Sequence, residues 1–235
     1  MSELEQLTLG LTQSNDCSYL PGESERLLVV YPNEQINSYI YQQLMERGFR
    51  RGGNDAYRPH CEHCRACQSI RINVDDFTPS KSQKRVLNKA KHITSRWVTE
   101  PSQDYFVLYS KYISLRHSDG SMYPPQLSAL ETFTKCDWLN IGFLESYDGD
   151  KLIGVAVTDI LGNGLSAVYT FFDPGYEALS LGKVHILRQI EQSRKLGLQY
   201  LYLGFQIDDC KAMNYKQQYR PNERYIDNRW IKYKN

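Results

Sequence analysis

The chain has 235 residues, of which 41% are hydrophobic and 23% are charged. This is ordinary globular composition, so it excludes a wholly disordered chain and allows one large domain or two small ones. The formal net charge of +1 neither requires nor excludes a nucleic-acid partner. The first residues lack the pattern of a secretory signal, and no stretch approaches the roughly 20 apolar residues of a membrane helix. We therefore expect a cytoplasmic protein with reduced cysteines and no membrane partner.

The first part of the chain predicts short extended segments around one helix. A buried strand is expected over 26–32, and a helix over 33–49, with Asn33 as its N-cap and Gly48 as its stop. A glycine-rich loop follows this helix. Alternating apolar and polar residues then predict a strand over 69–74.

Three cysteines in seven positions precede that strand. Cys61, Cys64 and Cys67 follow the pattern C-x2-C-x2-C, in which C-x2-C supplies two suitable zinc ligands. A tetrahedral zinc site needs four ligands, and a turn rarely directs three such residues at one ion. The residues therefore leave two interpretations open, a structural metal or a loop with buried free thiols.

A basic cluster lies in the next segment. Residues 77–99 contain six Lys or Arg and no Asp or Glu, on a chain that is nearly neutral as a whole. The lack of balancing acids favours an anionic partner such as a nucleic-acid backbone, and a solvated helix face is the alternative. The cluster, in a predicted helix, comprises Lys81, Lys84, Arg85, Lys89 and Lys91.

The second half predicts an alternation of helices and strands in which Gly-Asn-Gly joins two strands as a hairpin. The order strand, hairpin, strand, loop, helix, strand is typical of the N-acyltransferase architecture. In acyl-CoA enzymes the loop before the helix carries a glycine-rich pyrophosphate cradle, and Gly182 alone does not form one, so CoA is disfavoured. The expected elements are helices over 104–117, 125–136 and 180–196, and strands over 151–161, 165–173 and 198–207.

We therefore predict an α/β (α+β) fold, with a mixed sheet and flanking helices like those of the acyl-CoA N-acyltransferases (GNAT-like). Residues 101–235 are expected to form this transfer domain. Residues 1–100 are expected to form an N-terminal, cysteine-containing α/β region that recognises the acceptor and carries the basic cluster.

Two stretches carry a resemblance to a known family. Residues 166–207 contain Phe-Asp-Pro, Ser-Leu-Gly and Tyr-Leu-Gly, and residues 210–223 contain Met-x-Tyr-Lys and Tyr-Arg-Pro. Together with Cys-Ser-Tyr-Leu-Pro-Gly near the start and residues 51–61, these motifs resemble the aminoacyl-tRNA–protein transferase family. Within this family the chain is similar to the bacterial leucine-transferring branch, and the likeness covers nearly the whole chain.

The resemblance implies an enzyme that transfers leucine from leucyl-tRNA to the N-terminal Asp or Glu of proteins, which tags them for degradation by the N-end rule pathway. It implies leucyl-tRNA and acidic N-termini as partners, with no required cofactor and no CoA. The first alternative is an arginyl-tRNA-dependent transferase of the same fold. The others are an acetyl-CoA N-acyltransferase and a non-catalytic zinc-dependent RNA-binding module, in which the acyltransferase-like half would have no role.

The resemblance also bears on the cysteines. Eukaryotic members have two cysteines near the start and an adjacent pair later, associated with a metal or an iron–sulfur cluster. Cys17 matches this pattern and is a candidate ligand with Cys61, Cys64 and Cys67, whereas Leu20 stands where its C-x-x-C partner would fall.

The implied reaction indicates which side chains to examine. The acceptor carries a carboxylate beside its reacting amine, which requires fixed positive charge, and arginine offers bidentate geometry. Asp173 is the first candidate for a base or amine-orienting group, with a cap on the turn before Pro174 as the alternative. The acceptor-binding candidates are Arg51, Tyr57, Arg58 and Arg71, and those for the aminoacyl pocket are Tyr169, Phe171, Ser180 and Gly182.

Contacts with tRNA phosphates need charge more than a particular sequence, so the basic residues matter as a group. Tyr215 and Tyr219 lie four residues apart and are candidates for stacking on the exposed acceptor end, with core packing as the alternative. The full set of tRNA-binding candidates is Lys81, Lys84, Arg85, Lys89, Lys211, Tyr215, Lys216 and Arg220.

Overall fold

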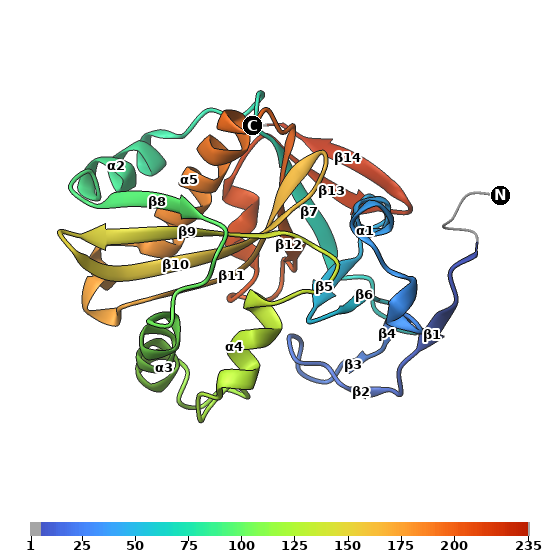
Figure 1. Ribbon diagram of the computed structural model, residues 1–235. Helices are drawn as coiled ribbons and strands as arrows, with labels where there is room; N and C mark the ends of the chain where they lie inside the picture. The colour runs from blue at the N-terminus through green and yellow to red at the C-terminus, as the bar shows by residue number, and fades with distance from the viewer. Residues whose placement is uncertain (1–5, 235) are drawn as a thin grey trace.

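An eight-stranded mixed sheet organises the molecule (Figure 1), in the order β14-β13-β7-β12-β11-β10-β9-β8. The structure, a computed structural model, describes residues 6–234. Every neighbouring pair in this sheet is antiparallel except β11 and β12, which are parallel. The strands are β7 (Gln68–Asn73), β8 (Thr94–Val98), β9 (Ile141–Asp148), β10 (Lys151–Ile160), β11 (Gly164–Phe172), β12 (Tyr200–Gln206), β13 (Asn222–Ile226) and β14 (Arg229–Tyr233).

Helices cover both faces of this sheet. On one face, α3 (Tyr105–Arg116) buries two tyrosines among core residues of β9, β10 and β11, and α4 (Leu127–Thr134) joins the same cluster. On the other face, α5 (Leu181–Lys195) buries its apolar side against β10, β11 and β12, with α2 (Lys81–Lys89) beside it. Figure 1 shows the two pairs of helices on opposite sides of the strands.

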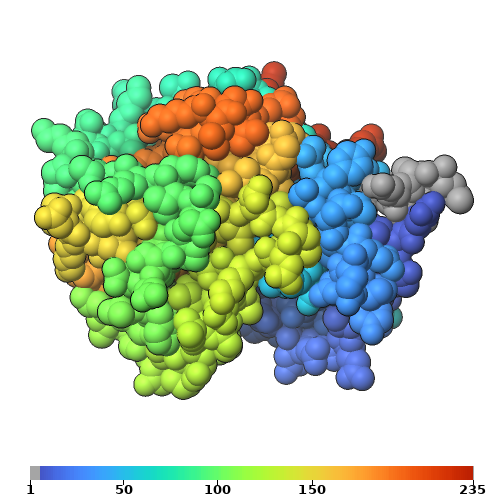
Figure 2. Space-filling view, in the orientation of Figure 1, coloured from blue at the N-terminus to red at the C-terminus, as the bar shows by residue number. Residues whose placement is uncertain are grey.

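A smaller sheet from the N-terminal part lies against the large one. It has the order β1-β4-β6-β5, and α1 (Ser38–Met45) packs between it and residues such as Leu139, Leu161 and Tyr202. Figure 2 shows the blue N-terminal part in direct contact with the yellow-green segment that precedes β9. The remaining strands are β1 (Leu9–Leu11), β2 (Asn15–Asp16), β3 (Ser24–Glu25), β4 (Leu27–Val30), β5 (Arg50–Gly52) and β6 (Asp55–Pro59). Short 3-10 helices include η2 (Asn33–Gln35), η3 (Pro174–Leu179) and η4 (Asn214–Gln218).

The structure confirms the predicted mixed α/β fold and the strand–hairpin–strand–loop–helix–strand order. β10 and β11 form the expected antiparallel hairpin. The predicted inner face of α5, Val184, Leu187 and Ile190, is buried. None of the helices in the described residues is long and apolar enough to cross a membrane.

Several local predictions were wrong. The helix expected over 33–49 begins only at Ser38, because the side chain of Asn37 accepts the N–H of Ile40 and caps it there. The glycine-rich loop contains β5 and β6, and the strands β8, β9, β13 and β14 lacked a clear sequence signal. β7 and β8, both from the first hundred residues, are strands of the large sheet, so this sheet crosses the predicted boundary at residue 100.

Candidate functional site

The parallel strands β11 and β12 pair only at their beginnings. Gly164–Ser166 lies in register with Tyr200–Tyr202, and beyond these residues β11 pairs only with β10, and β12 only with β7. The facing edges from Ala167 and from Leu203 onward therefore need other partners for their backbone groups. We call this region the β11/β12 split.

Arg50 of β5 provides the partner on the β11 side. Its Nη2 donates a hydrogen bond to the carbonyl oxygen of Ala167 at 2.9 Å, and its guanidinium carbon lies 5.8 Å from the ring centre of Phe205. Gly204 leaves the space for this group, because a Cβ there would collide with Nη1 of Arg50. Gly204 also has φ +82°, which favours glycine. The close approach of Arg50 and the backbone conformation together explain the glycine of the Tyr-Leu-Gly motif.

Lys216 provides the partner on the β12 side. Its Nζ donates to the carbonyl oxygen of Phe205 at 2.6 Å, and the side chain is buried. Burial lowers the pKa of Lys216 to about 7, and the positive charge of Arg50 contributes to the same shift. Within residues 6–234, neither cation has a carboxylate within ion-pair distance. The split therefore holds two cationic groups without an acidic partner.

Aromatic side chains surround these cations. Tyr57 of β6 lies opposite Arg50 in the strand register, and its ring centre is 6.4 Å from that of Phe205. Burial raises the pKa of Tyr215, and the nearby charge of Arg50 opposes this shift. On the β11 side, Tyr169 stacks on Phe133 with ring centres 4.4 Å apart. Tyr57 was predicted to bind the acceptor, Tyr169 to line the aminoacyl pocket and Tyr215 to stack on the tRNA end, and these roles stay predictions.

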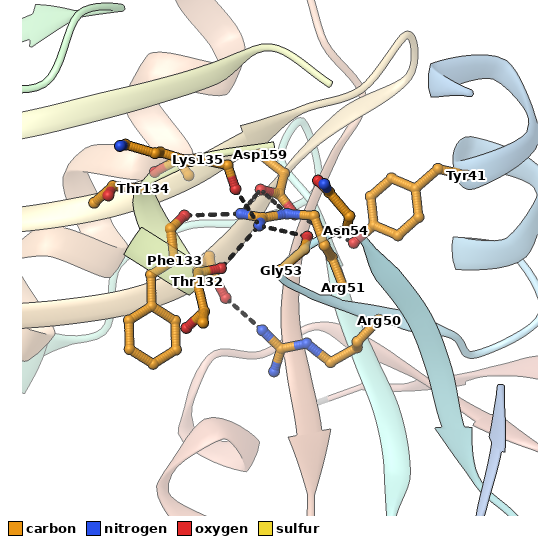
Figure 3. A network of polar contacts seen from close by, with 12 residues as sticks. Tyr41, Arg50, Arg51, Gly53, Asn54, Thr132, Phe133, Thr134, Lys135 and Asp159 are labelled. Carbon is orange, nitrogen blue, oxygen red and sulfur yellow. Dashed lines mark hydrogen bonds and ion pairs between the residues drawn. The ribbon is translucent and has the colours of Figure 1, made fainter. Parts of the chain in front are cut away.

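Arg51, the neighbour of Arg50, has a different environment (Figure 3). Its Nε and Nη2 donate to Asp159 at 3.0 and 2.7 Å, and both side chains have no exposed surface. The hydroxyl of Tyr41 donates to the same carboxylate. We call this group the Arg51 network, and it also includes the carbonyl oxygens of Gly53, Thr132, Phe133 and Lys135. Because all three guanidinium nitrogens are engaged, we assign Arg51 a structural role and leave it out of the acceptor site.

Arg71 is also neutralised by neighbouring groups. Its guanidinium donates to Glu46 at 2.6 Å and to Glu223 at 2.7 Å. The same guanidinium lies between the rings of Tyr200 and Trp230, at 3.9 and 4.1 Å from their centres. Two carboxylates already balance its single charge, so this geometry does not favour an acceptor carboxylate at Arg71.

Arg58 lies beside two cavities. Its Nη1 donates to the carbonyl oxygen of Arg47 at 3.0 Å, and its guanidinium lies over the ring of Phe49. It lines a cavity of about 610 Å³ together with Trp230, and a smaller cavity of about 260 Å³ that reaches Phe205. An acceptor-binding role for Arg58 stays a prediction.

Asp173 follows β11 and has its carboxylate fully engaged. It accepts hydrogen bonds from Lys111 at 2.7 Å, from Lys151 at 2.8 Å and from the N–H of Gly175 at 2.9 Å. Burial opposes its ionisation, but the hydrogen bonds from these three donors outweigh it and lower the pKa of Asp173 to about 2. These contacts match the capping role, and the role of Asp173 as a base stays a prediction.

The other predicted aminoacyl-pocket residues differ in their surroundings. Phe171 is fully buried among Tyr105 and Tyr109 of α3, so its side chain belongs to the core. Ser180 has φ 54° and precedes α5, and Gly182 has open space where a Cβ would lie.

The predicted tRNA-binding residues fall into two groups. Lys81, Lys84, Arg85 and Lys89 are exposed along α2, and Lys211 is exposed as well. Arg220 is partly exposed and donates to the backbone of Gln217 and Lys234. The prediction that Lys216 contacts tRNA phosphates was wrong, because its ammonium group is buried against Phe205. Tyr219 packs in the core, so the stacking proposed for it is also excluded.

The four N-terminal cysteines lie near one another. Burial raises the pKa of the Cys67 thiol to about 12, and the proximity of Cys61, Cys17 and Cys64 adds to this shift. Among residues 6–234, however, no group of three or more His, Cys, Asp or Glu side chains has a geometry suited to a metal ion. The thiols are therefore not arranged as a formed zinc or iron–sulfur site in this structure, and a structural metal stays a prediction.

Arg50 is a functional candidate that no local sequence signal singles out. Adjacent residues of a strand point to opposite faces, so only one of Arg50 and Arg51 can face a given site. The sequence does not state which one. The Tyr-Leu-Gly glycine is the other signal, since a glycine in a strand marks a bulge or a close approach of another group.

Comparisons with known proteins match this chain over nearly its whole length. The family described as arginine-tRNA-protein transferase, N terminus, matches residues 15–85, and its C-terminal counterpart matches residues 104–226. An aspartate/glutamate leucyltransferase of Aeromonas hydrophila is 46% identical over 230 residues, which cover 98% of this chain and 97% of that protein. An aspartate/glutamate leucyltransferase of Vibrio campbellii is 47% identical over 232 residues, which cover 97% of this chain and 98% of that protein.

Among solved structures, L-PGS from Bacillus licheniformis matches with a TM-score of 0.45 and 11% identity, over 72% of this chain and 49% of that one. The two family matches together span most of the chain, and the sequence relatives align over nearly its full length. The chain therefore belongs to the arginine-tRNA-protein transferase family.

Proposed function

We propose that the protein transfers leucine from leucyl-tRNA to the N-terminal Asp or Glu of proteins, and that the transfer takes place at the β11/β12 split. The observation that carries this proposal is the 46–47% identity, over nearly the whole chain, to proteins named aspartate/glutamate leucyltransferase. The modified proteins would then enter degradation by the N-end rule pathway. Because charged tRNA is a cytoplasmic substrate, we place the reaction in the cytoplasm.

The reaction needs little covalent assistance from the protein. The acceptor α-amine attacks the carbonyl carbon of the ester that joins leucine to the terminal ribose. A new C–N bond forms, the C–O bond breaks, the amine releases a proton and the ribose oxygen takes one up. An α-amine has a pKa of roughly 7.7–8.0, so part of it is already neutral at cellular pH. Holding the amine and the ester in the reacting geometry can contribute several kcal/mol.

The split offers features suited to this task. It lies between the two strands that start and end the loop–helix connection, and the half-buried side chains of Tyr169 and Tyr215 provide apolar surface near it. The exposed cations of α2 lie on the face of the large sheet that α5 also covers. We propose that α2 contacts the phosphates of the tRNA while the aminoacyl end reaches the split.

The proposal is tested by incubating the protein with radiolabelled leucyl-tRNA and, separately, arginyl-tRNA. Peptides that start with Asp, Glu or Ala serve as acceptors, and an N-acetylated Asp peptide serves as the control that lacks a free amine. Leucine on the Asp and Glu peptides alone is the expected result. Arginine transfer without leucine transfer would move the protein to the arginine branch. Transfer from neither tRNA would overturn the proposal.

A further inference from the structure

We propose that Arg50, with Lys216 beside it, binds the side-chain carboxylate of the acceptor's N-terminal residue and so selects Asp and Glu over neutral residues. This inference rests on the proposed function, because it names the acceptor subsite of that reaction. It replaces Arg51 and Arg71, whose charges are already balanced within the protein.

The guanidinium of Arg50 keeps hydrogen-bond donors that the described residues do not use. Nη2 of Arg50 binds the carbonyl oxygen of Ala167, and among residues 6–234 no hydrogen bond from its Nε or Nη1 is found. The residue is partly exposed, so a ligand can reach it. The planar guanidinium can present two parallel N–H groups to a carboxylate. Arg50 therefore has the geometry that acceptor recognition needs.

The positive charge at Arg50 and Lys216 is not balanced by an acidic side chain among the described residues. Arg50 and Lys216 lie close enough that Arg50 lowers the pKa of Lys216, yet within the described residues neither has an ion-pair partner. Two cations in a partly buried place are unfavourable until an anion joins them. An acidic side chain supplies that anion, whereas Asn or Ala leaves Arg50 unpaired and leaves Lys216 only partly protonated at pH 7. The cost of the unpaired charges is what discriminates between acceptors.

The surroundings of the two cations also suit a peptide acceptor. Tyr57 lies opposite Arg50 in the strand register and offers a neutral hydroxyl donor. Phe205, which faces Arg50, also lines the cavity of about 260 Å³ together with Arg58 and His60. An acceptor whose first side chain meets Arg50 thus has space beside it for the residues that follow.

The test measures binding first, without tRNA. Two peptides that differ only in starting with Asp or Asn, each labelled at its C-terminus, are titrated with the wild-type protein and with variants. Wild type should bind the Asp peptide about 10- to 100-fold more tightly, the range expected for hydrogen bonds between charged groups. Arg50→Gln should bring this ratio close to one by weakening the Asp peptide alone.

Two further variants control this result. Arg50→Lys keeps the positive charge but loses the two parallel N–H groups of the guanidinium. Its ratio of affinities for the Asp and Asn peptides should therefore lie between those of wild type and Arg50→Gln. Arg47→Gln is the matched control. Arg47 is an exposed arginine that also makes one hydrogen bond to a backbone carbonyl, that of Gln43 at 3.0 Å, and its substitution should keep the wild-type ratio. Circular dichroism and thermal melting show whether each variant is folded. If Arg50→Gln is not folded, the ratio measured with Arg50→Lys tests the inference instead.

The pH dependence gives a second readout. The charge of Arg50 lowers the pKa of Lys216, and Cys210 and Cys67 act in the opposite direction. The ammonium nitrogen of Lys216 lies 5.3 Å from the ring centre of Tyr215. As the pH rises above 7, Lys216 loses its proton, and the preference for the Asp peptide should fall. The side-chain carboxylate raises the pKa of the N-terminal amine in the Asp peptide. The amine pKa of each free peptide is therefore measured separately, and the binding constants are corrected for it. Lys216→Met should remove this pH dependence while Arg50 still provides part of the preference.

Several outcomes would overturn the inference. The inference is overturned if a folded Arg50→Gln protein keeps the wild-type ratio of affinities for the Asp and Asn peptides. If Arg50→Gln does not fold, the same result with Arg50→Lys overturns it. An equal loss for both peptides would also do so, because Arg50 would then serve a step that all acceptors share. If wild type prefers Asp through Arg50 yet transfers no leucine from tRNA, the proposed function fails while the carboxylate site stands.

Discussion

Strand β5 carries two arginines whose surroundings differ completely. Arg51 lies in a closed network, where Asp159 and four carbonyl oxygens use all three of its guanidinium nitrogens and no surface remains exposed. Arg50 lies at the β11/β12 split, where it makes one hydrogen bond to the backbone and, with Lys216, lacks an acidic partner among the described residues. In this protein, unused donors distinguish a binding arginine from a structural one.

The difference has a physical origin in the sheet. Where β10 and β11 stay paired, the ladder satisfies the backbone, and a buried polar side chain must find its partners within the protein. Where β11 and β12 part, backbone carbonyls are left free, and cationic side chains enter to satisfy them. The cations keep donors and charge that the backbone does not use, which makes the split suitable for a charged ligand.

The largest effect is expected from breaking the closed network. Arg51→Met leaves the carboxylate of Asp159 buried without its partner, which should lower the free energy of unfolding by about 3–5 kcal/mol. Urea denaturation measures this loss. Adding Asp159→Leu should recover much of it, because a buried ion pair is often replaceable by apolar groups. A stable Arg51→Met protein that no longer distinguishes Asp from Asn acceptors would instead return Arg51 to the acceptor site.

The carboxylate of Asp173, like that of Asp159, has its partners within the protein, so removing its charge should also lower the free energy of unfolding. Its pKa of about 2 lies below the ordinary 3.8, so its stabilising effect is present above pH 3.8 and lost as the pH falls toward 2. At pH 7, Asp173→Asn should lower the free energy of unfolding by about 1–2 kcal/mol, since its lysine partners are half exposed. Wild type and variant should converge near pH 2.

The transfer rate of Asp173→Asn tests the remaining hypothesis for this residue. We expect leucine transfer at pH 7 to stay within a few-fold of wild type. General bases contribute roughly 10²–10⁴-fold, so a loss of that size in a folded variant would establish Asp173 as the base.

Gly204→Ala tests whether the space beside Gly204 positions Arg50 in the β11/β12 split. With φ +82° the new side chain should cost about 1–2 kcal/mol of stability, and its Cβ would push the guanidinium of Arg50 out of the split. The preference for Asp over Asn peptides should therefore fall as well. Gly149→Ala is the matched control, because Gly149 also has positive φ but has no neighbour within 4 Å of its Cβ position. If both variants keep the wild-type preference, Gly204 does not position Arg50.

The smallest effect is expected on α2, whose cations are exposed. Replacing Lys81 and Lys84 by Gln should change stability by less than about 0.5 kcal/mol and leave peptide binding intact. The affinity for tRNA should depend less steeply on salt, by about 0.7–0.9 in the logarithmic slope for each phosphate that the protein no longer neutralises. Filter binding across a salt series measures this slope, with the exposed Lys135→Gln as control. An unchanged slope would remove α2 from the tRNA surface.

The regular elements of the second half could be predicted because their signals are local. The Gly-Asn-Gly turn predicted the β10–β11 hairpin, and the spacing of Val184, Leu187 and Ile190 predicted the buried face of α5. β13 and β14 carry polar residues at many positions, so the alternation that marks a buried strand is weak. β13 depends on pairing with β7, which lies about 150 residues earlier, and β14 in turn pairs with β13.

The sequence by itself determined the family, the mixed α/β fold and the exposed basic helix, because ordered motifs, hydrophobic periodicity and charge runs are properties of neighbouring residues. Only the tertiary structure decided which of two adjacent arginines is free, and that Lys216 is buried rather than exposed to tRNA. Both outcomes depend on the point at which β11 and β12 stop pairing. That point is fixed by contacts between distant segments, and no local pattern records which backbone groups those contacts leave unpaired.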